Sequence, residues 1–416
     1  PNLHARVHSN SPTNFQNLCY ETVKKGGGMP AFFNDHKIIP ALKNTGINQI
    51  DAHNYSIVGC AEWGSPGNSF PAAGAIFINI PMALHLALHS GKYNKKQYGP
   101  KTTELSKIKS TKTLINAFKK QLCFLLKEAT DGNNAIELTH ANHRPTPFLS
   151  VLIDGCLKNG KEVNDGGAYY NPTGCQGVGL ADVVDSLAVI DELVFQNKQI
   201  SLSEFIDIVD NDFNCNKTLH CKIINLKNKY GLDETSTNTL LKEISRIFTQ
   251  EVSKIKNSRK GFYNPGFWTM TTHQGFGKRT NTLPSGRLKG QSLSNGISPC
   301  NGKDNKGPTV SLSSASFLDS DLTGNGCVLN QKINPQYIKD EKGNSLLNSL
   351  VKGFFKKGGL QVQLNVIDPQ TLIKAKNNPE NYKDLVVRIS GYSAYFNDLT
   401  ESMKDEIIER TLHFNH

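Results

Sequence analysis

The chain has 416 residues, of which 37% are hydrophobic and 20% are charged, a composition that predicts a globular protein with a large core and excludes a mainly disordered chain. The most apolar stretch, residues 71–88, contains Asn79, Pro81 and His85, which excludes a membrane-spanning helix. Lysine and arginine outnumber acidic residues 47 to 36, but they are scattered and lack interleaved aromatic residues. We therefore expect neither a nucleic-acid nor a membrane partner.

The N-terminal sequence PNLHARVHSN has neither a basic and apolar signal sequence nor a small-residue cleavage site, so we expect a cytoplasmic protein. Residues 1–12 show no helix start and no strand alternation, which predicts that they continue a preceding, missing segment. The nine cysteines are odd in number and contain no C-x-x-C pair. This pattern favours reduced thiols over disulfides, a zinc site or an iron–sulfur cluster.

Hydrophobic spacing predicts an α/β protein. Short apolar runs predict strands at 55–58, 148–153, 360–367 and 385–389, and helical periodicity predicts helices around 114–125, 240–255 and 399–407. The separation of the strands by helices or long connections favours parallel pairing through crossovers. The long Gly-, Asn- and Ser-rich connection at 279–309 is typical of a segment that carries function or wraps another part of the protein.

A cysteine and a glutamate follow the first predicted strand, in the sequence YSIVGCAEWGSPG at 55–67. Side chains at positions i and i+2 of an extended backbone point to the same side. Cys60 and Glu62 would then face one cavity, as a reactive sulfur beside a general base. Taken alone, the motif is also typical of an inert buried cysteine and a structural carboxylate.

A glycine ends the last predicted strand, in the sequence LVVRISGYSAYF at 385–396. One interpretation of Gly391 is a turn residue with positive φ. The other is a radical site, because a glycine Cα that has lost hydrogen becomes planar and shares its unpaired electron with the neighbouring amide and carbonyl groups. Taken alone, the glycine favours the turn interpretation.

GCAE at 59–62 and VRISGYSAYF at 387–396, in this order, resemble the motifs of the glycyl radical enzymes, the superfamily of pyruvate formate-lyase, glycerol dehydratase and choline trimethylamine-lyase. Three further segments resemble the same family in the same order: PNLHARVHSNSP at 1–12, the glycine-rich segment with its following helix at 166–195, and LPSGRLKGQSLSNGISPCNGKDNKGPT at 283–309. The resemblance therefore extends from one end of the chain to the other.

The resemblance implies the C-terminal half of a ten-stranded barrel surrounded by helices, since family members are about twice this length. It implies a pyruvate formate-lyase-like barrel portion at 1–282, which carries the cysteine loop, and a glycyl radical domain at 283–416. It also implies a post-translational glycyl radical with no bound cofactor. The implied partners are a radical S-adenosylmethionine activating enzyme, a small substrate such as a polyol or sugar derivative, and a second copy when full length.

Carried over by motif, Gly391 would store the radical, Cys60 would become a transient thiyl, and Glu62 would be the base of a lyase or dehydratase. A formate acetyltransferase is disfavoured, because Gly59 precedes Cys60 where acyl transfer uses two adjacent cysteines. A decarboxylase and a catalytically silent C-terminal fragment stay open. For Cys175, in the sequence TGCQGVG, we weighed a turn that binds phosphate at a helix N-terminus against helix packing, and favoured packing.

Overall fold

Strands and helices alternate along most of the chain in the computed structural model, which describes residues 2–340 and 342–412. No helix in these two ranges is long and apolar enough to span a membrane. The strands are β1 (His4–Val7), β2 (Ala31–Asn34), β3 (Ser56–Val58), β4 (Glu62–Gly64), β5 (Ala72–Asn79), β6 (Lys92–Tyr93), β7 (Lys96–Gln97), β8 (Thr173–Val178), β9 (Tyr263–Gly266), β10 (Asn330–Ile333), β11 (Gln361–Val366), β12 (Val386–Arg388) and β13 (Ser393–Tyr395).

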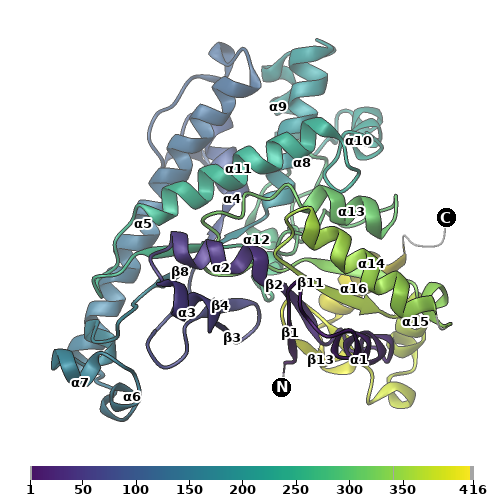
Figure 1. The fold of residues 1–416 in the computed structure, drawn as a ribbon. Coiled ribbons are helices and arrows are strands. Elements are labelled where there is room, and N and C mark those ends of the chain that lie inside the picture. Colours follow the sequence, from purple (N-terminus) through teal and green to yellow (C-terminus); the bar gives the residue numbers. More distant parts are fainter. Residues whose placement is uncertain (1, 341, 413–416) are drawn as a thin grey trace.

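The helices surround the strands, and the longest lies along one side of the molecule (Figure 1). They are α1 (Thr13–Lys24), α2 (Asp35–Asn44), α3 (Gln49–His53), α4 (Ile80–Leu88), α5 (Thr111–His143), α6 (Pro147–Val151), α7 (Cys156–Asn159), α8 (Leu180–Ile190), α9 (Leu202–Asp210), α10 (Lys217–Ile224), α11 (Thr235–Ser253), α12 (Thr272–Arg279), α13 (Pro308–Ala315), α14 (Lys342–Lys356), α15 (Pro369–Asn377) and α16 (Glu401–Leu412).

Five parallel strands form the centre of the fold. β5, β8 and β9 pair in that order, and β10 pairs with β11. An isolated parallel bridge between Phe267 and Cys327 joins the end of β9 to the residues just before β10. The resulting order is β5-β8-β9-β10-β11, with crossover connections between the strands as the alternation of strands and helices predicts.

A second, shorter group of strands runs in the opposite direction. β2 pairs antiparallel with β11, and β1 pairs parallel with β2. β1 and β5 are the outer strands of this arrangement, and no closed barrel is found among the strands of residues 2–340 and 342–412. The prediction of an α/β fold is confirmed, whereas the ten-stranded barrel is present only as two opposed parallel groups of five and two strands.

The main core lies between the five parallel strands and helices α4, α5, α8 and α11. Every residue of α8 is buried, including Asp182, Asp185 and Ser186, and the helix packs against α4 and α11. α5 begins where the side chain of Ser110 accepts a hydrogen bond from the backbone N–H of Thr113. The helices thus hold the strands that carry the site.

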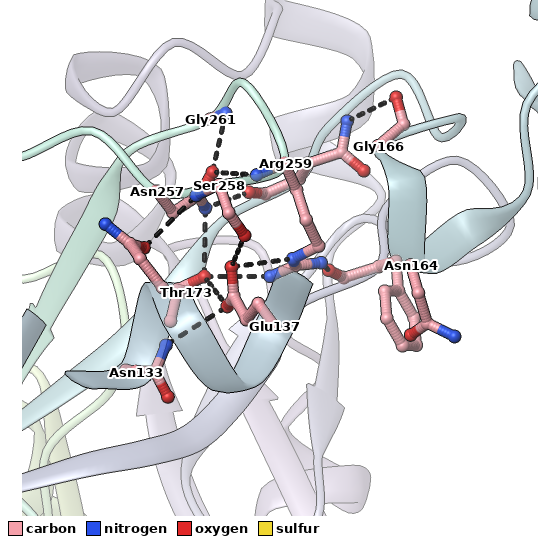
Figure 2. A network of polar contacts seen from close by, with 12 residues as sticks. Asn133, Glu137, Asn164, Gly166, Thr173, Asn257, Ser258, Arg259 and Gly261 are labelled. Atoms are coloured by element: carbon pink, nitrogen blue, oxygen red, sulfur yellow. Dashed lines mark hydrogen bonds and ion pairs between the residues drawn. The ribbon is translucent and has the colours of Figure 1, made fainter. Parts of the chain in front are cut away.

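A buried polar network fixes the beginning of β8 against α5. Glu137 of α5 accepts hydrogen bonds from Thr173 (2.7 Å) and Ser258 (2.6 Å), and its carboxylate lies 3.6 Å from Nε of Arg259. Figure 2 shows these side chains converging from α5, the start of β8 and the loop before β9. Arg259 also donates to the carbonyl oxygens of Phe70 and Pro172, both at 2.7 Å. The network therefore ties together the segments that enter three parallel strands.

The C-terminal residues form a second, smaller core. Buried residues of α15, β12 and α16 cluster with Phe396, separately from the main core: Leu372, Ala375, Val387, Ile389, Phe396, Met403, Ile407 and Ile408. The first and last parts of the chain lie side by side, since Arg388 donates to the side chain of Asn2 and Ser393 donates to the carbonyl oxygen of Gly27, and β1 and β13 lie in the same region of Figure 1. We refer to the eight buried residues as the C-terminal cluster.

Three local predictions are wrong. Residues 147–151 form the helix α6 and not a strand, because its apolar side chains, among them Phe148 and Leu149, are exposed and do not join a sheet. Residues 4–7 form the strand β1, in a segment for which we expected none. Cys175 lies in the strand β8 and not in a turn, and its side chain is fully buried. The predicted strands at 55–58, 360–367 and 385–389 and the three predicted helices are confirmed.

Candidate active site

Cys60 lies at the tip of a short hairpin. β3 and β4 pair antiparallel, and the turn between them contains residues 59–61. Gly59 has a φ of +68°, a conformation that favours glycine and allows the tight turn. The half-buried Cys60 side chain packs against a small cluster of Ala61, Trp268 and Val328. The residues of this turn are therefore held between the hairpin and the sheet.

Gly391 lies at the tip of a second hairpin, formed by β12 and β13. The N–H of Ile389 donates to the carbonyl oxygen of Tyr392 at 2.9 Å, which closes the turn. Gly391 has a φ of +82° and is buried. Gly391 is therefore a turn residue with positive φ, as one of the two interpretations predicts. A turn residue can also be a radical site.

The two hairpin tips are in direct contact. A Cβ atom added to Gly391 would lie 2.4 Å from Cβ of Cys60 and 3.4 Å from its Sγ. No real Cβ atom approaches another carbon to 2.4 Å, so the two backbones are this close only because residue 391 has no side chain. Cys60 and Gly391, which are 331 positions apart in the sequence, are brought together at one point.

Buried amide side chains hold the glycine hairpin in place. The carbonyl oxygen of Ile389 accepts hydrogen bonds from the side chains of Asn295 (3.4 Å) and Asn330 (3.2 Å). Ser390 is hydrogen bonded to Thr269 at 3.2 Å. These partners come from the long connection at 279–309, from β10 and from the segment after β9. The sheet and the long connection therefore position the backbone on the N-terminal side of Gly391.

Glu62 is the first residue of β4, and its carboxylate turns back onto the cysteine loop. Oε2 accepts hydrogen bonds from the backbone N–H groups of Cys60 (2.9 Å) and Ala61 (2.7 Å). Burial raises the pKa of Glu62, and the same two hydrogen bonds act in the opposite direction. Oε1 makes no hydrogen bond to a residue of the described ranges. Glu62 is thus fixed beside Cys60 with one carboxylate oxygen bound and the other available.

The electrostatic environment keeps the Cys60 thiol protonated. Burial raises the pKa of Cys60 to about 11, the nearby Glu62 carboxylate also raises it, and Arg388 acts against both. A thiol with such a pKa carries its hydrogen at neutral pH and is a poor thiolate nucleophile. The site therefore suits a cysteine that exchanges a hydrogen atom better than one that attacks a carbonyl group.

Comparison with known proteins decides the family. The description "Pyruvate formate lyase-like" matches residues 1–277, and the description "Glycine radical" matches residues 293–397. The chain belongs to the pyruvate formate lyase-like glycyl radical enzymes. The resemblance inferred from the two motifs is confirmed.

Relatives in this glycyl radical family are matched over nearly the whole chain. The chain is 35% identical to trans-4-hydroxy-L-proline dehydratase from Clostridioides difficile, over 99% of this chain and 52% of that protein. The glycerol-bound form of the B12-independent glycerol dehydratase from Clostridium butyricum matches with a TM-score of 0.96 and 38% identity, over 99% of this chain and 52% of that one.

A solved structure concerned with 1,2-propanediol dehydration in Roseburia inulinivorans also has a TM-score of 0.96, at 34% identity, with 99% of this chain and 53% of that chain covered. The chain therefore spans about half the length of the relatives that it matches.

Arg388 is a residue of this candidate site that the sequence analysis missed. Its guanidinium donates to Gln363 and to Asn2, both at 2.9 Å, and its charge acts on Cys60. Burial lowers the pKa of Arg388 to about 10. Arg388 lies three residues before Gly391, within the same sequence motif, and this closeness could have identified it as a candidate site residue. The amides Asn295 and Asn330 carried no such signal, since only the fold brings them to the hairpin.

Proposed function

We propose that this chain carries the radical and hydrogen-transfer residues of a glycyl radical dehydratase or related lyase that acts on a small hydroxylated substrate, such as a polyol or sugar derivative. One observation carries the proposal: the contact between Gly391 and Cys60, which no residue larger than glycine permits. Relatives named as dehydratases of trans-4-hydroxy-L-proline and of glycerol support the reaction class.

In this proposal, Gly391 stores the radical after an activating enzyme removes hydrogen from its Cα. Cys60 then gives its S–H hydrogen atom to Gly391 and becomes a thiyl radical. The thiyl takes a hydrogen atom from a hydroxyl-bearing carbon of the substrate, which re-forms the S–H bond. The direct contact between the two residues and the protonated state of the thiol both support this exchange.

Glu62 is the general base of the proposed elimination. It removes the proton of the hydroxyl group on the substrate radical, and the resulting ketyl expels the neighbouring hydroxyl group. That group leaves as water with the proton that Glu62 took up, which restores the carboxylate. Cys60 returns its hydrogen atom to the product radical. The raised pKa of Glu62 and its oxygen without a hydrogen bond to a described residue support a base that works near neutral pH.

Formate acetyltransferase activity is the less favoured reaction. Residue 59, next to Cys60, is a glycine with a φ of +68°, so the turn offers no second thiol to carry an acetyl group. A decarboxylase also pairs a cysteine with a glutamate, and its substrate would bear a carboxylate. The relatives at 35% and 38% identity, from Clostridioides difficile and Clostridium butyricum, are both named as dehydratases, which favours elimination.

In this proposal, catalytic turnover requires additional strands around the site and an activating enzyme. β1 and β5 are outer strands of the described sheet, and we propose that additional strands complete a barrel around the site. We keep the division into a barrel portion at 1–282 and a glycyl radical domain at 283–416 as part of the proposal. The activating partner is a radical S-adenosylmethionine enzyme, and the active protein works in an anoxic cytoplasm.

The test compares the wild-type chain with Cys60→Ser, each produced without oxygen together with an activating enzyme. Both should give a glycyl doublet in electron paramagnetic resonance, since the radical is installed at Gly391 in each. Only the wild type should dehydrate glycerol or propane-1,2-diol, because the O–H bond of serine is too strong to exchange hydrogen.

Each protein is assayed alone and with the N-terminal half of the Clostridium butyricum enzyme added to supply missing strands. Turnover by Cys60→Ser, or a wild type without a doublet, would refute the proposal. A doublet without any turnover in the wild type would favour the catalytically silent fragment.

A further inference from the structure

Two histidines and an aspartate come together at the ends of two helices. His85 lies in the last turn of α4, His89 is the C-cap residue of the same helix, and Asp210 is the last residue of α9. One ligand atom from each of the three lies within 4.8 Å of the others. The proposed radical chemistry uses none of these side chains.

We propose that His85, His89 and Asp210 form a site for a divalent first-row transition ion such as Zn²⁺. Histidines at i and i+4 share one face of a helix and can bind one ion together. Two imidazoles and a carboxylate are ligands that suit zinc, nickel or iron, whereas Mg²⁺ and Ca²⁺ prefer oxygen ligands. The site would therefore select a transition ion.

The orientation of His89 fits the role of a ligand. Its Nδ1 lies 2.8 Å from the carbonyl oxygen of His85 and donates to it, which leaves Nε2 directed at the carboxylate of Asp210, 2.8 Å away. A hydrogen bond from one ring nitrogen to a carbonyl group is the usual support of a histidine that binds metal through the other nitrogen. An ion would take the place of the proton between His89 and Asp210.

His85 supplies the second observation. His85 is 8% exposed; its ring stacks on His89, with 4.1 Å between the ring centroids, and meets the ring of Tyr93 edge-on. Neither of its ring nitrogens has a hydrogen-bond partner within residues 2–340 and 342–412. Little water reaches this ring, and a bound ion would give one of its nitrogens a partner.

The space between the three side chains is adequate for one ion. A cavity of about 10 Å³ is lined by all three together with Leu88, Val209 and Leu283, and such a volume holds one water-sized particle. Donor atoms around a tetrahedral zinc are about 3.4 Å apart, given Zn–N distances near 2.0–2.1 Å. The carboxylate of Asp210 is 40% exposed, so a rotation of this side chain can close the site.

The helix ends add a favourable electrostatic potential. α4 and α9 both direct their C-terminal ends, which carry partial negative charge, toward the three side chains. An ion bound there would connect the end of α4 to the end of α9. We infer a structural role for the ion, as a clamp between these two helices.

The test measures Co²⁺ and Zn²⁺ binding to the full 416-residue chain by equilibrium dialysis, with the visible absorption of bound Co²⁺ as the spectroscopic readout. Exposed Cys215 and Cys221 are first changed to serine, because thiolates also bind zinc. We expect one Co²⁺ per chain, its displacement by Zn²⁺, and a higher Tm with Zn²⁺ present.

Asp210→Asn and His89→Ala should each weaken binding at least tenfold and remove the Tm increase, since loss even of an outer partner of a metal ligand costs ten- to a hundredfold in affinity. Asp210 is exposed, so its replacement by asparagine leaves the fold intact. The matched control is His140→Ala with His143→Ala, two exposed histidines one turn apart on α5, which should bind as before. Absence of stoichiometric Co²⁺ binding, or unchanged affinity in both Asp210→Asn and His89→Ala, would overturn the proposal.

Discussion

Gly391 is restricted to glycine by its surroundings as well as by its backbone. Its φ of +82° is strained for any residue with a side chain, and a Cβ would overlap with Cys60. Both constraints result from the direct contact of two hairpin tips. The same contact is what a hydrogen atom would need to move between the two residues, so the packing and the proposed chemistry require the same amino acid.

Gly391→Ala should therefore lose the glycyl doublet and cost more than about 1 kcal/mol in the free energy of unfolding, because the native backbone conformation is incompatible with alanine.

In the activated wild type, dioxygen should react at Cα of Gly391 and cut the chain into fragments that end near Ser390 and begin near Tyr392. Mass spectrometry after exposure to air measures the cut. The control is Gly353→Ala, in α14 with open space around it, which should keep both the glycyl doublet and the cut at Gly391. A cut at another glycine would place the radical at that glycine.

Glu62→Gln keeps the shape of the side chain and removes its charge. If Glu62 is the base, kcat should fall by roughly two to four powers of ten, the usual range for the loss of a general base. Burial raises the pKa of Glu62, so more of the carboxylate is protonated at a given acidic pH, and the wild-type rate should rise with pH through that raised pKa.

The acidic limb of the pH profile should be absent in Glu62→Gln, because glutamine does not titrate there. A structural role would lower stability and leave the pH profile in place. An unchanged kcat together with an unchanged profile would assign the base to another residue.

Among the elements, helices with a clear period and strands with an apolar or alternating run, such as the buried strand β11, are easier to predict than strands without such a run. The amphipathic helix around 240–255 showed a clear period and is α11. β8 has the sequence TGCQGV, in which all six residues are buried, so it has neither alternation nor an apolar run and was mistaken for a turn. Its glycines are required by close packing: a Cβ on Gly174 would lie 1.8 Å from the carbonyl oxygen of Ala73.

The position of the candidate site was predictable only in part, for a related reason. Cys60, Glu62 and Gly391 lie in motifs that can be read from the sequence. The partners of the glycine hairpin are amides from distant segments, such as Asn295 and Asn330, and their residue types are equally common on surfaces. Hydrogen bonds between segments about 60 to 90 residues apart leave no local pattern.

Glu137→Gln tests the buried network at the entry of the central strands. Arg259, whose pKa is lowered by burial, would lose its nearest carboxylate while it remains buried. Removal of one partner of a buried ion pair costs about 3–5 kcal/mol, and we expect the lower end of this range because Arg259 keeps its hydrogen bonds to Phe70, Pro172 and Thr173.

Urea unfolding measures the change in the free energy of unfolding. Asp131→Asn, which removes an exposed ion pair with Lys127 on the same helix, is the control and should have no measurable effect. Equal stability of Glu137→Gln and the wild type would show that the charge of Glu137 is dispensable in this network.

At the scale of the whole molecule, two cores meet around the candidate site. The C-terminal cluster is separate from the main core, so polar contacts carry much of the connection between them. One buried contact of this kind joins α12 to α16: Nε2 of His273 lies 3.0 Å from both carboxylate oxygens of Glu406, and Gln274 donates to the same carboxylate at 2.8 Å. Gly391 is buried, so under the proposed function an activating enzyme would reach it only when the C-terminal cluster loosens.

His273→Phe should weaken this connection without leaving a large cavity. A hydrogen bond to a charged group contributes about 1.5–3 kcal/mol, so local opening of the C-terminal cluster should become roughly ten to a hundred times more frequent. Hydrogen exchange followed by mass spectrometry should show faster exchange in β12, β13 and α16, with no change in α5 and β8. Lys383→Ala, which removes an exposed ion pair with Glu380 shortly before β12, is the control and should leave exchange as it is. Equal acceleration in all elements would indicate global destabilisation, and no acceleration in β12 and β13 would show that the hydrogen bond to Glu406 does not hold the C-terminal cluster in place.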